Sequence, residues 1–166
     1  MTKVGLTPYS QYLDLAKPGH QKTGCGITCL GMFLGKKISN LDELYKLGLE
    51  QNAYQPEVGW RHKGLADLAI SFGLKNSYNL DLAGEDIELA LTKLKTELKE
   101  GPVVVSVFAK YKPGNAEGHL VVLLSLNEKE ATLLDPATKD RNKIELKIPA
   151  TKFIKAWKKR LVVFRP

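Results

Sequence analysis

The stretch Gly101-Pro102-Val103-Val104-Val105 divides the chain into two halves with different patterns. Glycine and proline interrupt helices, whereas a run of valines is typical of a buried strand. Before this stretch, apolar residues recur at helical spacing. After it, they form short runs rich in Val, Ile and Leu. Helices followed by strands predict an α+β fold, in which a helical half (about residues 1–100) packs against a C-terminal antiparallel β-sheet (about residues 101–166).

Working outward from this point, we expect strands on one side and helices on the other. The predicted strands are 103–108, 119–126, 131–134, 144–148 and 161–164, with a hairpin turn at 127–130 and a helix at 150–158. The predicted helices before Gly101 are 25–34, one capped by Ser39 or Asn40 and reaching Leu49, 65–72 and 85–99. Residues 1–23 contain several prolines and glycines without a sustained period, and we expect an extended lead-in.

The length of 166 residues is that of one domain, 1–166. The formal charge of +7 could support binding to nucleic acid, an acidic peptide or an anionic surface, and it selects none of them. Two cysteines four residues apart do not form a disulfide framework. Because no signal peptide or membrane span is recognised, a cytoplasmic protein is expected.

Cys25 is the candidate nucleophile because it begins a predicted helix. A helix N-terminus and a neighbouring imidazolium lower the pKa of a thiol from about 8.5 to roughly 3.5–7.5. Glycines on both sides of Cys25 are interpreted as room for a substrate backbone. The alternative is that Cys25 is a small buried apolar residue, as free cysteines commonly are.

His119 and Asp135 are the candidate partners of this thiol. His119 opens one predicted strand and Asp135 ends the next. If these strands pair as a hairpin, both side chains lie at the same end of the sheet, where the carboxylate can hold the imidazole. Separately, each has a simpler interpretation, as a surface histidine and as an aspartate that caps a turn.

Three short segments resemble the bacteriocin-processing peptidases, which cleave double-glycine leader peptides, and their stand-alone relatives. They are GCGITCLGM at 24–32, GHLVV at 118–122 and LDP at 134–136. The similarity covers nearly the whole chain, since the helix before GPVVV at 101–105 also fits. The resemblance implies a papain-like cysteine peptidase fold in which Cys25 attacks a carbonyl, His119 moves the proton and Asp135 orients His119.

The resemblance also implies a glutamine upstream of the cysteine that donates to the oxyanion. Gln11, in the segment Pro8-Tyr9-Ser10-Gln11, matches this pattern, and Gln21 is the alternative. Loss of such a donor typically lowers turnover by about 10² to 10³. The segment 12–23 is longer than the spacing of the leader peptidases, which leaves the substrate preference open.

The sequence therefore predicts a thiol hydrolase, with a peptide or small amide as its substrate and with no metal or cofactor. An acyl or peptidyl transferase would use the same three residues, and a peptide-binding module of this fold would use none of them catalytically. Cys29 is expected in the core, His20 and His62 at the surface. The basic run 139–160 more simply marks a helix than a nucleic-acid site. Oligomeric state and any transporter partner stay open.

Overall fold

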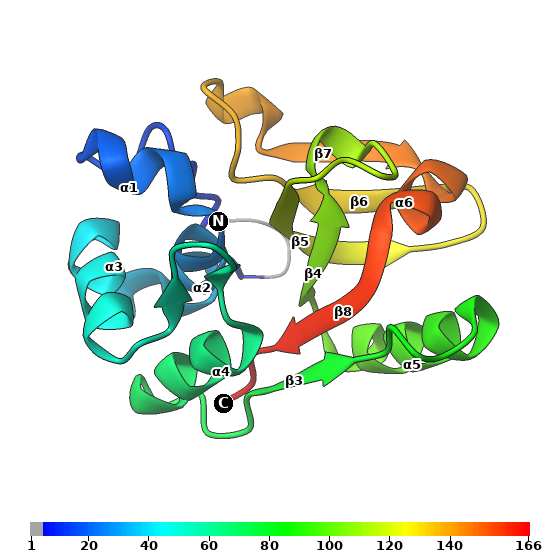
Figure 1. Cartoon of the computed structure of the whole chain (residues 1–166), viewed down its shortest axis with the longest axis horizontal. Helices are drawn as coiled ribbons and strands as arrows, with labels where there is room; N and C mark the ends of the chain where they lie inside the picture. Colours follow the sequence, from blue (N-terminus) through cyan, green and yellow to red (C-terminus); the bar gives the residue numbers. More distant parts are fainter. Residues whose placement is uncertain (1–4) are drawn as a thin grey trace.

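A six-stranded antiparallel sheet forms the centre of the computed structural model, which describes residues 5–166 (Figure 1). Its strands lie in the order β3-β8-β4-β5-β6-β7. They are β3 Tyr78–Asp81, β4 Val103–Phe108, β5 Gly118–Leu126, β6 Glu130–Leu134, β7 Glu145–Pro149 and β8 Trp157–Val163. A separate two-stranded ribbon joins β1 Tyr54–Gln55 to β2 Gly59–Trp60. The antiparallel sheet and the helical N-terminal half confirm the predicted α+β class.

Helices cover both faces of the sheet (Figure 1). The helices are α1 Pro18–Thr23, α2 Cys25–Leu34, α3 Leu41–Glu50, α4 His62–Ser71, α5 Ile87–Glu100 and α6 Ala150–Ala156, with 3-10 turns η1 Gly35–Lys37, η2 Ala109–Tyr111 and η3 Arg141–Lys143. One hydrophobic cluster joins α2, α3 and α4 to the sheet, and a second joins α5 and α6 to its other face. Alternate residues of β5 supply the two clusters, Val122 to the first and Val121 to the second.

Local capping explains where the predicted helices begin and end. Asn40 accepts a hydrogen bond from the Glu43 amide at the start of α3, and Asp86 does the same for α5. Gly35 follows α2 and Gly101 follows α5, both at positive φ, where a side chain would be strained. The helices predicted at 25–34 and up to Leu49 are confirmed.

The lead-in is not extended throughout, and this prediction is wrong for residues 18–23, which form α1. Pro18 is the first residue of this helix, a position that needs no amide hydrogen. None of the α1 residues is buried. The sequence therefore has no hydrophobic period from which this helix could be predicted. Residues 1–4 of the lead-in lie outside the described residues.

Other boundaries also differ from the prediction. α4 begins at His62, before the expected residue 65, and β3 adds an edge strand to the half expected to be helical. α6 ends at Ala156, because Trp157 already pairs with Val107 of the sheet and begins β8.

The β5–β6 hairpin positions the candidate site. Asn127 donates its amide to the Glu130 carbonyl in the predicted turn, and Val122 lies opposite Leu134 in the register. The beginning of β5 and the end of β6 therefore meet at one end of the sheet. α2 packs against β5 there, as part of the first cluster.

Candidate active site

Cys25 is the first residue of α2, directly after the corner where α1 ends. Gly24 forms this corner and belongs to both helix termini. The first amides of a helix have no acceptor within it, so they surround the thiol with partial positive charge. The Cys25 side chain is half-buried and lines a cleft of about 820 Å³, which gives a substrate access to the sulfur.

The glycines beside Cys25 serve packing, and the interpretation that they make room for a substrate is wrong. A Cβ atom at Gly24 would clash with the Leu15 side chain and lie 2.6 Å from the His20 carbonyl oxygen. A Cβ atom at Gly26 would lie 2.7 Å from Cγ of Trp60. These two glycines thus let α1 and Trp60 approach the start of α2 closely, which fixes the position of the thiol.

His119 and Asp135 lie in direct contact at the end of the hairpin. Nε2 of His119 is 2.7 Å from Oδ1 of Asp135, and the two side chains are only 12% and 13% exposed. Oδ1 also accepts the Ala137 amide at 2.9 Å. Because Nε2 contacts Asp135, the other ring nitrogen, Nδ1, is the one available for the hydrogen bond between His119 and Cys25. The structure thus brings together three of the four predicted site residues.

The electrostatics of these three side chains favour an ion pair. Burial raises the pKa of the Cys25 thiol, but the hydrogen bond and charge of His119 outweigh it, so the pKa lies below its usual value. Burial lowers the pKa of His119, yet its bonds to Asp135 and Cys25 raise it to about 10. Burial also opposes the charge of Asp135, and His119 overcomes this effect and holds the Asp135 pKa below its ordinary value. These shifts favour the charged forms of both side chains, a thiolate beside an imidazolium.

Cys29 has the opposite environment, although it lies one turn along the same helix. It is fully buried, and its thiol donates to the Leu120 carbonyl at 3.4 Å. Burial raises its pKa well above the usual value, with the charges of Cys25 and Asp135 acting in the same direction. Cys29 is therefore a core residue, as predicted.

Gln11 lies between Gly24, which precedes Cys25, and Pro136, which follows Asp135. Its backbone N–H donates to the Pro136 carbonyl at 2.9 Å. Its Cβ is 3.6 Å from the point where a Cβ of Gly24 would be. Its side chain is buried, and Nε2 donates to the Gln21 carbonyl at 2.7 Å. Oε1 of Gln11 is buried and has no hydrogen-bond partner within residues 5–166.

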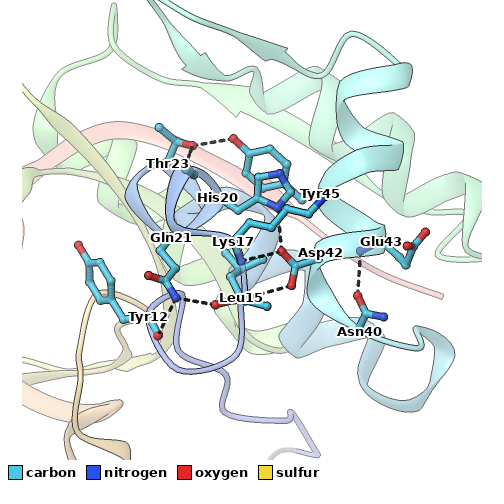
Figure 2. Close-up of polar contacts among 12 residues, drawn as sticks. Tyr12, Leu15, Lys17, His20, Gln21, Thr23, Asn40, Asp42, Glu43 and Tyr45 are labelled. Carbon is cyan, nitrogen blue, oxygen red and sulfur yellow. Dashed lines mark hydrogen bonds and ion pairs between the residues drawn. The ribbon is translucent and has the colours of Figure 1, made fainter.

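Gln21, the alternative donor, turns its side chain into the loop that precedes α1 (Figure 2). Its Nε2 donates to the carbonyls of Leu15 at 2.7 Å and Tyr12 at 3.3 Å. Both amide hydrogens of Gln21 are thus used to hold the segment 12–21, while Gln11 has one hydrogen left.

His20 packs between α1 and α3, close to the start of α2 in the sequence. It was expected at the surface, but its side chain is half-buried. Figure 2 shows its ring beside Tyr45 and Asp42 of α3: Nδ1 lies 2.8 Å from Asp42 Oδ1, and the ring stacks on Tyr45 at 3.8 Å. Tyr45 in turn contacts the Thr23 hydroxyl at 2.6 Å, and Trp60 donates to the Thr23 carbonyl at 2.6 Å. This network joins α1 to α3 immediately before the nucleophile.

Sequence reasoning missed Tyr111. Its hydroxyl donates to Oδ2 of Asp135 at 2.7 Å. Tyr111 and Lys110 both have positive φ, at 54° and 57°, in the turn that follows β4. No motif marks such a turn in the sequence, and a tyrosine in a polar loop gives no signal of contact with a carboxylate.

Two properties bear on membrane and metal chemistry. Among residues 5–166, no helix is both long and apolar enough to cross a bilayer. In the same range, no group of three or more His, Cys, Asp or Glu side chains is arranged to hold a metal ion. His62, expected at the surface, lines the Cys25 cleft.

Comparisons with known proteins identify the family and the fold. The profile of the Peptidase_C39-like family matches residues 5–161. A protein from Bacillus anthracis assigned as a C39-like peptidase is 23% identical, with a TM-score of 0.64 over 98% of this chain and 96% of that one. No protein with a curated description matches.

Two further similar structures are peptidase parts of transporters. The peptidase domain of Streptococcus ComA, a bifunctional ABC transporter of a quorum-sensing pathway, has a TM-score of 0.59 at 16% identity, over 87% of this chain and 93% of that one. A double-glycine motif protease from an AMS/PCAT transporter, in complex with its leader peptide, has a TM-score of 0.52 at 20% identity, over 86% and 84%. At these identities the likeness concerns the fold, and it is the family profile, covering nearly the whole sequence, that shows that this chain belongs to the Peptidase_C39-like family.

Proposed function

We propose that this protein is a thiol hydrolase that cleaves a peptide or amide bond through an acyl-enzyme on Cys25. The observation that carries this proposal is the position of His119, which hydrogen-bonds both Cys25 and the Asp135 carboxylate. A nucleophile, a base and a group that orients the base are the arrangement that covalent acyl transfer requires.

In the first step, the Cys25 thiolate forms a bond to the scissile carbonyl carbon, and the carbonyl electron pair moves to its oxygen. When this intermediate collapses, the C–N bond breaks and the leaving amine takes a proton from the His119 imidazolium. A water molecule then gives a proton to His119 and attacks the thioester, which releases the acid and restores the Cys25–His119 pair. Asp135 keeps Nε2 of His119 engaged, so that Nδ1 faces the sulfur throughout.

Gln11 is the proposed oxyanion donor, together with the backbone N–H of Cys25. One hydrogen of Gln11 Nε2 is used by the Gln21 carbonyl, and the second is free to stabilise the developing charge. The buried position of Gln11 beside Gly24 supports this role, because a donor that is already fixed needs no reorganisation during the reaction. Gln21 is a poor candidate because Tyr12 and Leu15 use both of its hydrogens.

A peptide is the proposed substrate, and residues 1–166 are proposed to form one papain-like domain. The AMS/PCAT protease that resembles this chain was solved with a leader peptide bound.

Both hydrophobic clusters pack against the same sheet, which supports a single domain.

The proposal is tested by incubating the protein with a pool of synthetic decapeptides of random sequence and identifying new termini by mass spectrometry. We expect cleavage by the wild type and none by Cys25→Ala, with Cys29→Ala close to wild type. In the presence of ¹⁸O-labelled water, a hydrolase places one ¹⁸O in each new carboxylate. Transfer to added amines without ¹⁸O uptake would instead identify a transferase, and intact peptides would contradict both.

A further inference from the structure

The cleft that contains Cys25 and His119 is lined by more cations than carboxylates. The basic side chains are Lys22, Arg61, Lys63, Lys158 and Arg160, and the acidic ones are Glu57, Asp81 and Glu117. Two of the cations are neutralised: Lys63 pairs with Asp67 at 2.7 Å, and Arg160 pairs with Asp81 at 3.2 Å. Of the remaining cations, Arg61 donates to the Asn52 carbonyl at 3.5 Å. Lys22 and Lys158 are therefore the candidates for contact with a bound substrate.

Lys22 and Lys158 have no carboxylate within ion-pair distance in the part of the chain that the structure describes, residues 5–166. Lys158 is half-buried and lies over the ring of Phe108, 5.4 Å from its centroid. Its Nζ is 3.4 Å from the point where a Cβ of Gly118 would be, so the ammonium group lies beside the residue that precedes His119. Lys22 is in the last turn of α1, three residues before Cys25. These two unpaired ammonium groups line the same cleft as Cys25 and His119.

His62 lines the same cleft and is affected by the same charges. Burial lowers its pKa, and the charges of Arg160 and Lys158 lower it further against the opposing effect of Asp81. His62 is consequently neutral near pH 7 and adds no charge of its own. The cleft is thus positive because lysines and arginines outnumber the carboxylates among its lining residues.

We infer that the substrate carries a carboxylate close to the scissile bond, held by Lys158 and Lys22. This inference rests on the proposed function, since it specifies the substrate class of the same site. The carboxylate is supplied either by an Asp or Glu side chain or by the free C-terminus of a short product-like peptide. Complementary charge of this kind selects partners and speeds their association.

The experiment compares fluorescein-labelled octapeptide pools that differ in one position. In each pool one position is fixed as Glu, Gln or Lys, and the fixed position is shifted along the peptide from pool to pool. All of these peptides have an amidated C-terminus. One further pool has Gln at the fixed position and a free C-terminal carboxylate. Cleavage is measured with the wild type, and binding is measured by anisotropy with Cys25→Ala. We expect the Glu pool, at one or two adjacent positions, to bind and react about tenfold better than the Gln pool. A gain only in the pool with the free C-terminus assigns the carboxylate to the chain end.

Lysine substitutions locate the effect. We expect Lys158→Met to lower the Glu-to-Gln preference about fivefold, and the exposed Lys22→Met to lower it less. Lys155→Met is the matched control, because it removes the same charge from the exposed face of α6, away from the cleft, and should leave the preference unchanged. Raising the salt concentration tenfold should weaken the preference.

The outcomes separate the inference from the proposed function. Equal binding and cleavage of the Glu and Gln pools would overturn the carboxylate inference and leave the hydrolase intact. A Glu preference in binding without cleavage of any pool would support the inference and contradict the hydrolase. Equal inhibition of all pools by single-stranded DNA, without a Glu preference, would identify the cleft as a nucleic-acid site and overturn the inference.

Discussion

The hydroxyl of Tyr111 donates a 2.7 Å hydrogen bond to Oδ2 of Asp135, the carboxylate oxygen that His119 leaves free. The Asp135 side chain is only 13% exposed, so water cannot readily replace this donor. Tyr111 reaches it from a turn at positive φ, a conformation that costs about 1–3 kcal/mol for a residue with a side chain. We therefore propose that Tyr111 is a positioning residue for the Asp135 carboxylate, which contacts His119.

Tyr111→Phe should therefore lower kcat about tenfold with little change in KM, because Asp135 would lose the donor that fixes its rotation. The free energy of unfolding should fall by about 2 kcal/mol, since a buried carboxylate oxygen is left without a partner. Turnover and urea unfolding are measured on the same preparation, under conditions where both proteins are folded. An unchanged kcat together with the loss of stability would mean that Tyr111 has a structural role only.

The two cysteines should differ strongly in reactivity. At pH 7, iodoacetamide should modify Cys25 and leave Cys29 intact, because only Cys25 is accessible and has a lowered pKa. Intact mass and peptide mapping of the wild type, Cys25→Ala and Cys29→Ala measure this. Equal labelling of the two single variants would contradict an activated Cys25.

Removal of the imidazole should raise the pKa of Cys25. In the wild type, the bond to and charge of His119 outweigh burial, and in His119→Ala burial is opposed only by the weaker backbone hydrogen bonds of Leu120 and Gly26. The inflection in the alkylation rate, measured from pH 5 to 10 in a Cys29→Ala background, should move upward from its wild-type position below 9.0. His62→Gln is a control for loss of a cleft histidine, and an unchanged inflection in His119→Ala would disprove the pairing.

Because of Asp135, the free energy of unfolding should decrease as the pH is lowered in the acidic range. Its folded-state pKa is below the ordinary value of 3.8, so the carboxylate stabilises the fold above that pH, and this contribution is lost as the pH falls through the folded pKa. Asp135→Asn should unfold about 2 kcal/mol more easily than the wild type at pH 7. The difference should shrink below pH 3.8. A constant difference in urea unfolding down to pH 3 would show that the charge of Asp135 does not contribute.

The close packing at Gly26 should make that position sensitive to one methyl group. Gly26→Ala would force Trp60 to move, which should cost about 1–3 kcal/mol and displace the start of α2. Gly19→Ala is the matched control, because a Cβ there meets no atom within 4 Å. Thermal unfolding and Cys25 alkylation are measured for both variants. Similar behaviour of the two variants would disprove the role of the Gly26–Trp60 contact.

The parts of the site that the sequence predicts are those that follow from local rules. A helical period that begins at Cys25 and ends at Gly35 locates the thiol at a helix start. The turn after Asn127 pairs two strong strands and so places His119 and Asp135 at the same end of the sheet. These inferences need only periodicity and turn composition.

The missed features depend on contacts between distant segments. β3 is a four-residue edge strand with no fully buried residue, and α1 buries none of its side chains, so neither has a hydrophobic pattern. Tyr111 reaches Asp135 only because two successive residues adopt positive φ, which sequence composition does not predict. The glycines around Cys25 were misinterpreted because the groups that fill their space, Leu15, His20 and Trp60, come from other segments.

Two contacts join the segment before α1 to the segment after β6, and they affect when the site can form during folding. Gln11 bonds the carbonyl of Pro136, and Asp14 pairs with Arg141 across 127 positions of sequence. A chain still emerging from the ribosome holds its thiol long before it holds the segments that carry His119, Asp135 and Arg141. Assembly of the proposed nucleophile and its base therefore depends on non-local contacts, and it cannot be complete before the segments that carry His119, Asp135 and Arg141 have been synthesised.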